Sequence, residues 1–180
     1  MVTGRQIAEQ AKNPKYDKLK YSDADCQEFV ERVLKDCGVR KDDNTVYNWR
    51  GSNSMWRNAL LWKGTKEQCI EKFGYIPVGA WVFIHAYDGG EVEKGYHDNE
   101  GNARHVGIYV GDDVPDKEVR DSTQTRTRDG VGYRKLEGFN MVGLPYMIDY
   151  SVTAEPSDRP ITKAEALEAL QTLTKYIKGV

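Results

Sequence analysis

The chain has 180 residues, which is enough for one domain with a buried core. Lysine and arginine (26) nearly balance aspartate and glutamate (28), and the resulting net charge of -2 gives no electrostatic reason to expect nucleic acid or an anionic membrane as a partner. Hydrophobic residues make up 39% of the sequence, which argues against disorder, and no apolar run approaches the roughly 18–20 residues of a membrane-spanning helix.

Helix signals dominate the N-terminal part of the chain. Residues 3–12 predict a short helix capped by Thr3. A stronger signal covers residues 26–37, where apolar residues recur at helical spacing and Gly38 follows as a C-terminal cap. A polar loop that carries two tyrosines separates these two predicted helices.

Two more short helices are expected before the middle of the chain. One covers residues 53–61, NSMWRNALL. The other covers residues 65–73; it opens with Thr65 and Gln68 at the spacing of a capping box and is followed by Gly74. The pattern therefore predicts four helices ahead of any strand.

Short β-rich runs bounded by glycine, proline and aspartate begin at residue 76. They are IPVGAWVFIHA, ARHVGIYVGD, KEVRDST, GVGYRKL and MVGLPYMIDY. Helices followed by strands are typical of an α+β fold, so we expect the N-terminal helices to pack on an antiparallel sheet of about five to six strands.

The domain organisation is predicted from changes in composition. Residues 1–152 are expected to form the catalytic domain, with a long polar hairpin loop at residues 88–104. Residues 153–161, TAEPSDRPI, are interpreted as a linker, and residues 162–180 as a C-terminal amphipathic helix.

The three cysteines are expected to be free thiols. Their number is odd and they form no CxxC pair, which argues against a disulfide framework and against a structural zinc site. Cys37 and Cys69 fall among apolar residues of predicted helices, so we interpret both as structural. Cys26 is different, because in YSDADCQEFV it falls in the first turn of its helix, where backbone N–H groups favour a thiolate.

A nucleophilic cysteine needs a base, and the chain has only three histidines. His97 falls in the polar loop and is interpreted as a surface residue. His85 follows the apolar run WVFI and is expected to be a partly buried structural residue, with the role of base as a second choice. His105 opens HVGIYVGD, where it shares a strand face with Gly107 and Tyr109 and suits a base that faces a cleft.

These segments together resemble the NlpC/p60 superfamily of cell-wall cysteine peptidases. The resemblance is carried by DC with FV two residues later, then PVGAWVFI, HVGIYVGD and VRDST, and it covers roughly residues 5–150. WRGSNSMWR, GTKEQC and IPVGAWVF are similar to phage-derived or prophage-encoded members from Gram-positive gut bacteria. The resemblance implies a papain-like core with the cysteine at a helix start and the histidine on a strand.

Carried over residue by residue, the resemblance implies that Cys26 is the nucleophile, His105 the general base and Asp121 the third catalytic residue. A carboxylate suits the third role because it can orient an imidazole and stabilise the imidazolium. The register of this strand stays open, since a slip of one residue would present Arg120 or Ser122 instead. Asp121 would then be an acid on the surface of a strand edge.

The substrate-binding side chains follow from the same comparison. The tyrosine that precedes the cysteine in the family corresponds to Tyr16 or Tyr21, with Tyr16 slightly preferred. Asp25 matches the acid of the family's Asp-Cys-Ser-Gly, whereas Gln27 and Glu28 replace its last two residues. We expect Tyr16, Tyr21, Asp25 and Gln27 to line the substrate pocket, whose shape and charge should therefore differ from those usual in the family.

The resemblance implies hydrolysis of the bond between the γ-carboxyl of D-glutamate and the diamino acid of the peptidoglycan stem peptide, by a monomer that needs no metal or other cofactor. Two alternatives stay open. One is an amidase of the CHAP type, which shares the order of cysteine and histidine and cuts between muramic acid and L-alanine. The other is a wall-binding or virion module without turnover.

The expected place of action is the cell wall. The N-terminal stretch MVTGRQIAEQAKN lacks the apolar core of a signal peptide. We therefore expect synthesis in the cytoplasm, followed by release through a holin, delivery within a phage tail, or another export route.

Overall fold

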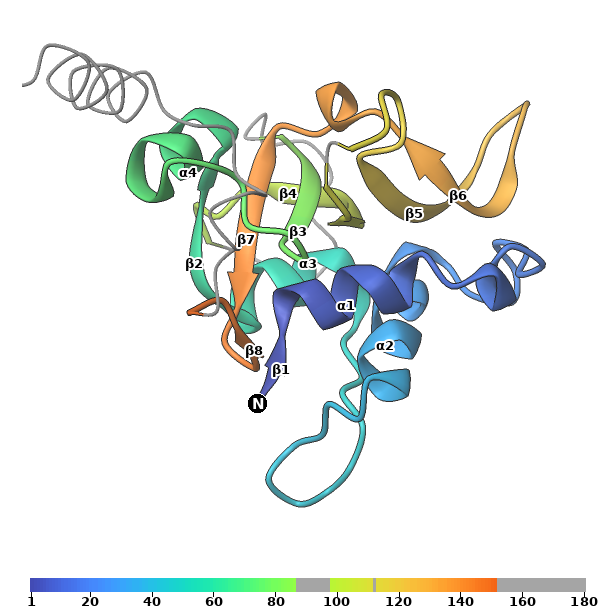
Figure 1. Cartoon of the computed structure of the whole chain (residues 1–180), viewed down its shortest axis with the longest axis horizontal. Helices are drawn as coiled ribbons and strands as arrows, with labels where there is room; N and C mark the ends of the chain where they lie inside the picture. Colours follow the sequence, from blue (N-terminus) through green and yellow to red (C-terminus); the bar gives the residue numbers. More distant parts are fainter. Residues whose placement is uncertain (87–97, 112, 152–180) are drawn as a thin grey trace, which may run out of the picture.

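The computed structural model describes residues 1–86, 98–111 and 113–151. Within this part of the chain, four α-helices and a six-stranded antiparallel sheet form a mixed α+β fold (Figure 1). The predicted fold class is confirmed at this level. Most of the predicted hairpin loop, the predicted linker and the predicted C-terminal helix lie outside the described residues.

The helices begin and end close to their predicted positions. The four helices are α1 (Gly4–Ala11), α2 (Cys26–Asp36), α3 (Gly51–Asn58) and α4 (Lys66–Phe73). Helices α1, α2 and α4 each open with a capping box. In each, the side chain of the capping residue accepts the backbone N–H of the residue three positions later, and the side chain of that later residue accepts the backbone N–H of the capping residue. Gly74 ends α4 in the left-handed conformation (φ 82°) that glycine adopts without strain.

The sheet has the strand order β2-β7-β3-β4-β5-β6. Its members are β2 (Leu60–Thr65), β3 (Trp81–Ala86), β4 (Asn102–Tyr109), β5 (Val119–Gln124), β6 (Asp129–Arg134) and β7 (Met141–Pro145). Two short strands, β1 (Val2–Thr3) and β8 (Ile148–Asp149), pair in parallel beside it. The segments from residue 76 onward therefore form strands as predicted.

Strand β2 corrects the sequence prediction. Residues 60 and 61 were expected to end a helix, but α3 stops at Asn58 and residues 60–65 form an edge strand. They pair with β7, for example Lys63 with Gly143, about 80 positions further along the chain. The local pattern could not reveal a strand that is stabilised by so distant a partner.

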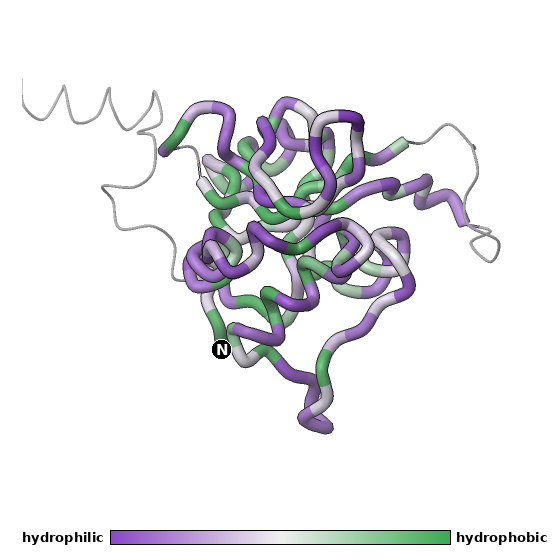
Figure 2. Tube along the Cα trace, turned by 90° about the vertical axis from the view of Figure 1, so that its right-hand side faces the viewer, coloured by the Kyte–Doolittle hydropathy of each residue, from purple (hydrophilic) through white to green (hydrophobic). Residues whose placement is uncertain are grey.

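Hydrophobic clusters cover both faces of the sheet. Helices α1, α2 and α3 contact β4, and their apolar side chains meet Val106 and Ile108 in the larger cluster. Tyr109 lies on the opposite face, in a smaller cluster that includes Cys69 of α4. The alternation predicted for this strand is thus confirmed. Figure 2 shows hydrophobic residues along the inner parts of the trace, while the tip of the protruding loop between α2 and α3 is hydrophilic.

Candidate active site

Cys26 is the first residue of α2. Asp25 caps the helix: its Oδ1 accepts the N–H of Glu28 at 2.9 Å, and the Glu28 carboxylate accepts the N–H of Asp25 at 3.2 Å. The first N–H groups of a helix have no partners inside it and favour negative charge nearby. The side chain of Cys26 is only 7% exposed. The local sequence therefore holds a thiol at an electropositive and largely desolvated helix start.

Hydrogen bonds to β5 and β6 fix the segment that leads to Cys26. The Ser122 hydroxyl donates to the carbonyl of Ala24 at 2.5 Å, and the N–H of Val131 donates to the carbonyl of Leu19 at 3.2 Å. Gly130 has φ 114°, and a Cβ at this position would lie 1.9 Å from the Leu19 oxygen, so a side chain would push the segment away. The loop before the cysteine is thus held against the β5–β6 hairpin.

His105 and Asp121 meet on one face of the sheet. Ile108 of β4 pairs with Arg120 of β5, and the next residue of β5, Asp121, lies beside Gly107. His105 is two positions from Gly107 and therefore on the same face of the sheet. The His105 Nε2–H donates to Asp121 Oδ2 at 2.6 Å. Asp121 is fully buried, which excludes the alternative of a surface acid at a strand edge.

The neighbours of Asp121 on β5 point the other way. Arg120 donates to the carbonyl of Ala11 at 3.1 Å and to Asp17 at 2.6 Å, and Ser122 binds the segment ahead of α2. The structure therefore has the register in which Asp121, rather than Arg120 or Ser122, contacts His105. Ser122 instead ties the cysteine segment to the same strand.

The His105 ring lies between Asp121 and Cys26. Burial lowers the pKa of His105, but hydrogen bonds with Asp121 and Cys26 and the charges of both groups raise it more, to about 9. Because Nε2 is bound to Asp121, Nδ1 is the ring nitrogen left for the sulfur. Phe139 stacks on the ring with centroids 6.0 Å apart. The arrangement favours the protonated imidazole of His105.

Two arginines that the sequence interpretation missed bind the Asp121 carboxylate. Arg128 donates to Oδ1, and Arg134 donates to Oδ2 at 3.2 Å. Burial raises the pKa of Asp121, but the contacts with His105 and Arg128 lower it by more than burial raises it. The pKa of Asp121 therefore lies below its usual value. The two arginines come from the turn and strand after VRDST, a charged stretch whose role no local spacing indicated.

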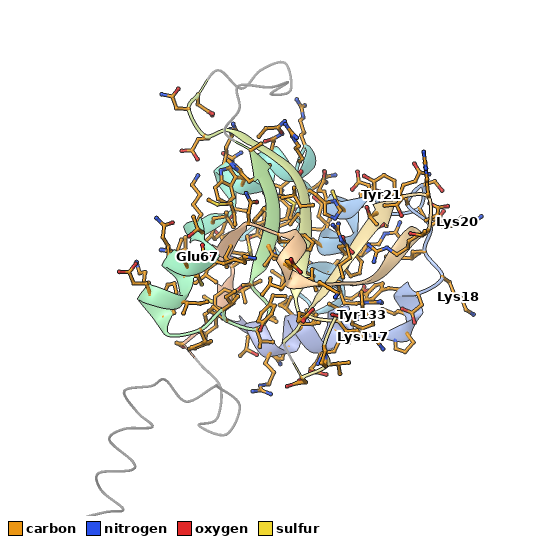
Figure 3. All side chains as sticks on the ribbon, turned by 90° about the horizontal axis from the view of Figure 1, so that it is seen from above. Lys18, Lys20, Tyr21, Glu67, Lys117 and Tyr133 are labelled. Carbon is orange, nitrogen blue, oxygen red and sulfur yellow. The ribbon has the colours of Figure 1, made fainter. Side chains whose placement is uncertain are left out.

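The two candidate tyrosines have different surroundings. Tyr21 lies beside the nucleophile: burial, then the charges of Cys26 and Asp25, raise the pKa of its phenol to about 12. Figure 3 shows Tyr21 with Lys18 and Lys20 on the side of the molecule where β5 and β6 lie, opposite Glu67 of α4.

The structure places Tyr16, the tyrosine that the sequence analysis slightly preferred, away from Cys26. Its hydroxyl donates to Asp36 Oδ2 at 2.6 Å and accepts from Gln10 at 3.0 Å, and its ring packs edge-on against Phe29. Asp36 is the last residue of α2, whose first residue is Cys26, so about three helical turns separate the Tyr16 hydroxyl from the nucleophile. Tyr16 is a core residue with a satisfied hydroxyl.

Asp25 and Gln27 flank the nucleophile but serve the fold. Asp25 is the helix cap described above. The Gln27 amide donates to Glu31 at 2.8 Å and accepts the N–H of Gly51 at 2.5 Å, which ties α3 to α2. Both polar ends of Gln27 are therefore used in hydrogen bonds inside the protein, and its role in a substrate pocket stays a prediction.

Cys37, Cys69 and His85 lie apart from this cluster. His85 is buried, its Nε2 lies 2.7 Å from the carbonyl of Glu100, and it contacts Trp56, as expected of a structural residue. Burial raises the pKa of Cys69 to about 12. His97 is outside the described residues.

Two other kinds of feature are absent from residues 1–86, 98–111 and 113–151. These ranges contain no group of three or more His, Cys, Asp or Glu side chains that could hold a metal ion. They also contain no helix that is long and apolar enough to cross a membrane.

The cluster combines the parts that nucleophilic catalysis by a thiol requires. Cys26 supplies the sulfur, His105 can accept and return a proton, and Asp121 orients the imidazole. Backbone N–H groups at the start of α2 are suited to stabilise an oxyanion. Comparison of the chain with models of known protein families, with curated proteins and with solved structures found no match.

Proposed function

We propose that the protein is a cysteine peptidase that hydrolyses an amide bond in the stem peptide of peptidoglycan. The observation that carries the proposal is the buried bond of 2.6 Å from His105 to Asp121, next to a cysteine at the first position of a helix. A nucleophilic cysteine needs both a base and a group that orients the base, and His105 and Asp121 supply the two.

The reaction proceeds through an acyl-enzyme. The Cys26 thiolate attacks the amide carbonyl, and N–H groups at the start of α2 stabilise the oxyanion. The His105 imidazolium gives its proton to the leaving amine, which breaks the C–N bond. Neutral His105 then takes a proton from water, the hydroxide attacks the thioester, and the thiolate leaves to restore the ion pair.

The substrate class rests on the resemblance to NlpC/p60 peptidases. It points to the bond between the γ-carboxyl of D-glutamate and the diamino acid. It also points to a phage-derived lysin or a related enzyme that reaches the wall through a holin, in a phage tail or by another export route. Tyr21 is the tyrosine that borders the thiol and is suited to contact the substrate.

The test is mass spectrometry of fragments released from purified peptidoglycans with lysine and with diaminopimelate stems. The proposal predicts fragments that end at D-glutamate, and none from the Cys26→Ala variant. Release of whole stem peptides that begin with L-alanine would identify an amidase instead. No release from either wall would contradict the proposal and favour a binding module.

A further inference from the structure

Asp121 stands between two glycines on neighbouring strands. On β6 its direct partner in register is Gly132. On β4 the opposite position is Gly107, where an added Cβ would lie 3.2 Å from the Asp121 Cβ. Residues directly opposite on paired strands share a face. The carboxylate therefore has space on both sides that no directly paired side chain occupies, and residues from diagonal positions enter that space.

The space above Gly132 is filled by Arg128. A Cβ on Gly132 would lie 2.7 Å from both Cδ and Nη1 of Arg128. The Arg128 side chain thus crosses β6 over the glycine; its Nη2 donates to Asp121 Oδ1 and its Nη1 donates to the carbonyl of Tyr133 at 2.9 Å. Gly132 is not among the glycines with positive φ, so it is needed for space and not for its conformation.

The turn before β6 fixes the starting point of this side chain. The N–H of Thr125 donates to the carbonyl of Arg128 at 2.7 Å, and the N–H of Arg128 donates to the Thr125 hydroxyl at 3.1 Å. Arg126 belongs to the same turn but is exposed. The turn therefore carries two arginines, of which one is directed across the strand to the buried carboxylate.

We infer that Arg128 is a positioning residue of the site: it crosses Gly132 to hold Asp121 ionised and in one orientation, with Oδ1 bound to the guanidinium and Oδ2 directed at His105. A fully buried carboxylate is costly to keep ionised unless it is paired and hydrogen-bonded. The inference rests on the proposed function, since it concerns the thiolate–imidazolium pair. It adds a cation and a glycine to the residues on which that pair depends.

Loss of this cation should move both protonation steps of the pair in the same direction. Without Arg128, the His105 imidazolium would be easier to keep and the Cys26 thiolate harder to form. The acidic limb and the alkaline limb of the pH dependence of Cys26 reactivity should therefore both move to higher pH. The charged and titratable groups that face the pair come from each element around it: Tyr21 from the loop before α2, Asp121 from β5, Arg128 from the turn and Arg134 from β6.

The experiment measures the rate at which iodoacetamide alkylates Cys26 as a function of pH in the full chain, together with kcat and KM for release of stem-peptide fragments. For Arg128→Gln we expect both limbs to rise by about half to one pH unit. We also expect kcat to fall roughly 10–100-fold with KM nearly unchanged, because positioning acts on the transition state. Arg126→Gln is the matched control, which removes the same charge from the same turn and should leave the limbs in place.

Two further variants separate charge from geometry. Arg128→Lys keeps the cation but cannot bridge Asp121 and the Tyr133 carbonyl, so the limbs should stay while kcat falls. Gly132→Ala keeps every charge but displaces the Arg128 side chain, and kcat should fall as in Arg128→Gln. Circular dichroism verifies that each variant is folded.

The outcomes are decisive in both directions. If Arg128→Gln leaves both limbs where they are in a folded protein, or if Arg126→Gln moves them equally, the inference is overturned. An unmodified protein that shows a thiolate–imidazolium profile and hydrolysis would in that case keep the proposed function. If the unmodified protein shows neither, the proposed function fails and the role of Arg128 fails with it.

Discussion

Helix α2 carries a cysteine at each end, and the two ends give the thiol opposite surroundings. Cys26 is the first residue, next to the His105 imidazole. Cys37 is the C-terminal cap, where burial and the neighbouring charge of Asp36 raise the pKa of the thiol to about 11. A helix start favours an anion and a helix end disfavours one.

We expect the electrostatic surroundings, and not the exposure, to decide which of the two thiols reacts faster. Cys37 is half-buried, whereas Cys26 is buried at 7% exposure. Cys37 is the more accessible thiol, but burial and the charge of Asp36 disfavour its thiolate. The thiolate is the form of a cysteine that acts as a nucleophile. The difference between the two ends should therefore depend on His105 and its partners, and the following experiments test that dependence.

The largest effect is expected from removal of the base. His105→Ala should reduce hydrolysis by about 10⁴–10⁶-fold, because the thiol loses the group that ionises it and the leaving amine loses its proton donor. Alkylation of Cys26 should also slow toward the rate of Cys37. The comparison variant is His85→Ala, which in folded protein should keep most activity; full activity in the His105 variant would falsify the assignment of the base.

Selective labelling tests the two ends directly. At pH 7, iodoacetamide should modify Cys26 roughly 10²–10³ times faster than Cys37. With a pKa of about 11, only about one Cys37 thiol in 10⁴ is ionised at this pH, partly offset by the higher intrinsic reactivity of a basic thiolate. Peptide mapping of the labelled protein gives the ratio, and equal labelling of both cysteines would break the comparison.

The third residue should matter less than the base. Asp121→Asn should lower kcat by roughly 10–10³-fold, since an amide can still orient the imidazole but carries no charge to stabilise the imidazolium. Ser122→Ala, the matched change on the opposite face of β5, should leave kcat nearly unchanged while costing about 1 kcal/mol of stability through its lost bond to Ala24. Steady-state kinetics in which Ser122→Ala is the damaging variant would contradict the role of Asp121.

Stability should depend on pH through His105. Its pKa is raised in the folded protein from an ordinary 6.5 to about 9, so its stabilising contribution is fully present below about pH 6.5 and is lost as the pH rises through about 9. Urea unfolding at pH 6 and pH 9.5 should show a loss on the order of 2–3 kcal/mol. His105→Gln should lack most of this loss, and an identical pH dependence in that variant would assign it to other groups.

The smallest effect on turnover is expected at the tyrosines. Tyr21→Phe should lower kcat/KM by about threefold to tenfold through loss of a hydroxyl beside Cys26, with little change in stability. Tyr16→Phe should leave kcat/KM unchanged and lower stability by about 1 kcal/mol, because Asp36 and Gln10 lose a buried partner. Kinetics with the reverse pattern would restore Tyr16 as the substrate-side residue.

Features that depend on neighbours within a few positions could be predicted from the sequence. The caps at Thr3 and Thr65, the glycine after α4 and the alternation in HVGIYVG are local, so they were predicted correctly. The thiol at a helix start belongs to the same class, since a cap and a first turn occupy four consecutive residues. His105 was chosen as the base of Cys26 from its position at the start of HVGIYVGD, and the resemblance then assigned it the same role.

Features that join distant segments became visible with the three-dimensional fold. Strand β2 exists because β7 pairs with it, and Tyr21 rather than Tyr16 borders the thiol because Leu19 and Gly130 hold its loop against the β5–β6 hairpin. Arg128 reaches Asp121 because Gly132 leaves the space. Such contacts depend on which strands lie side by side and on the room between them, and no periodicity along the chain encodes either.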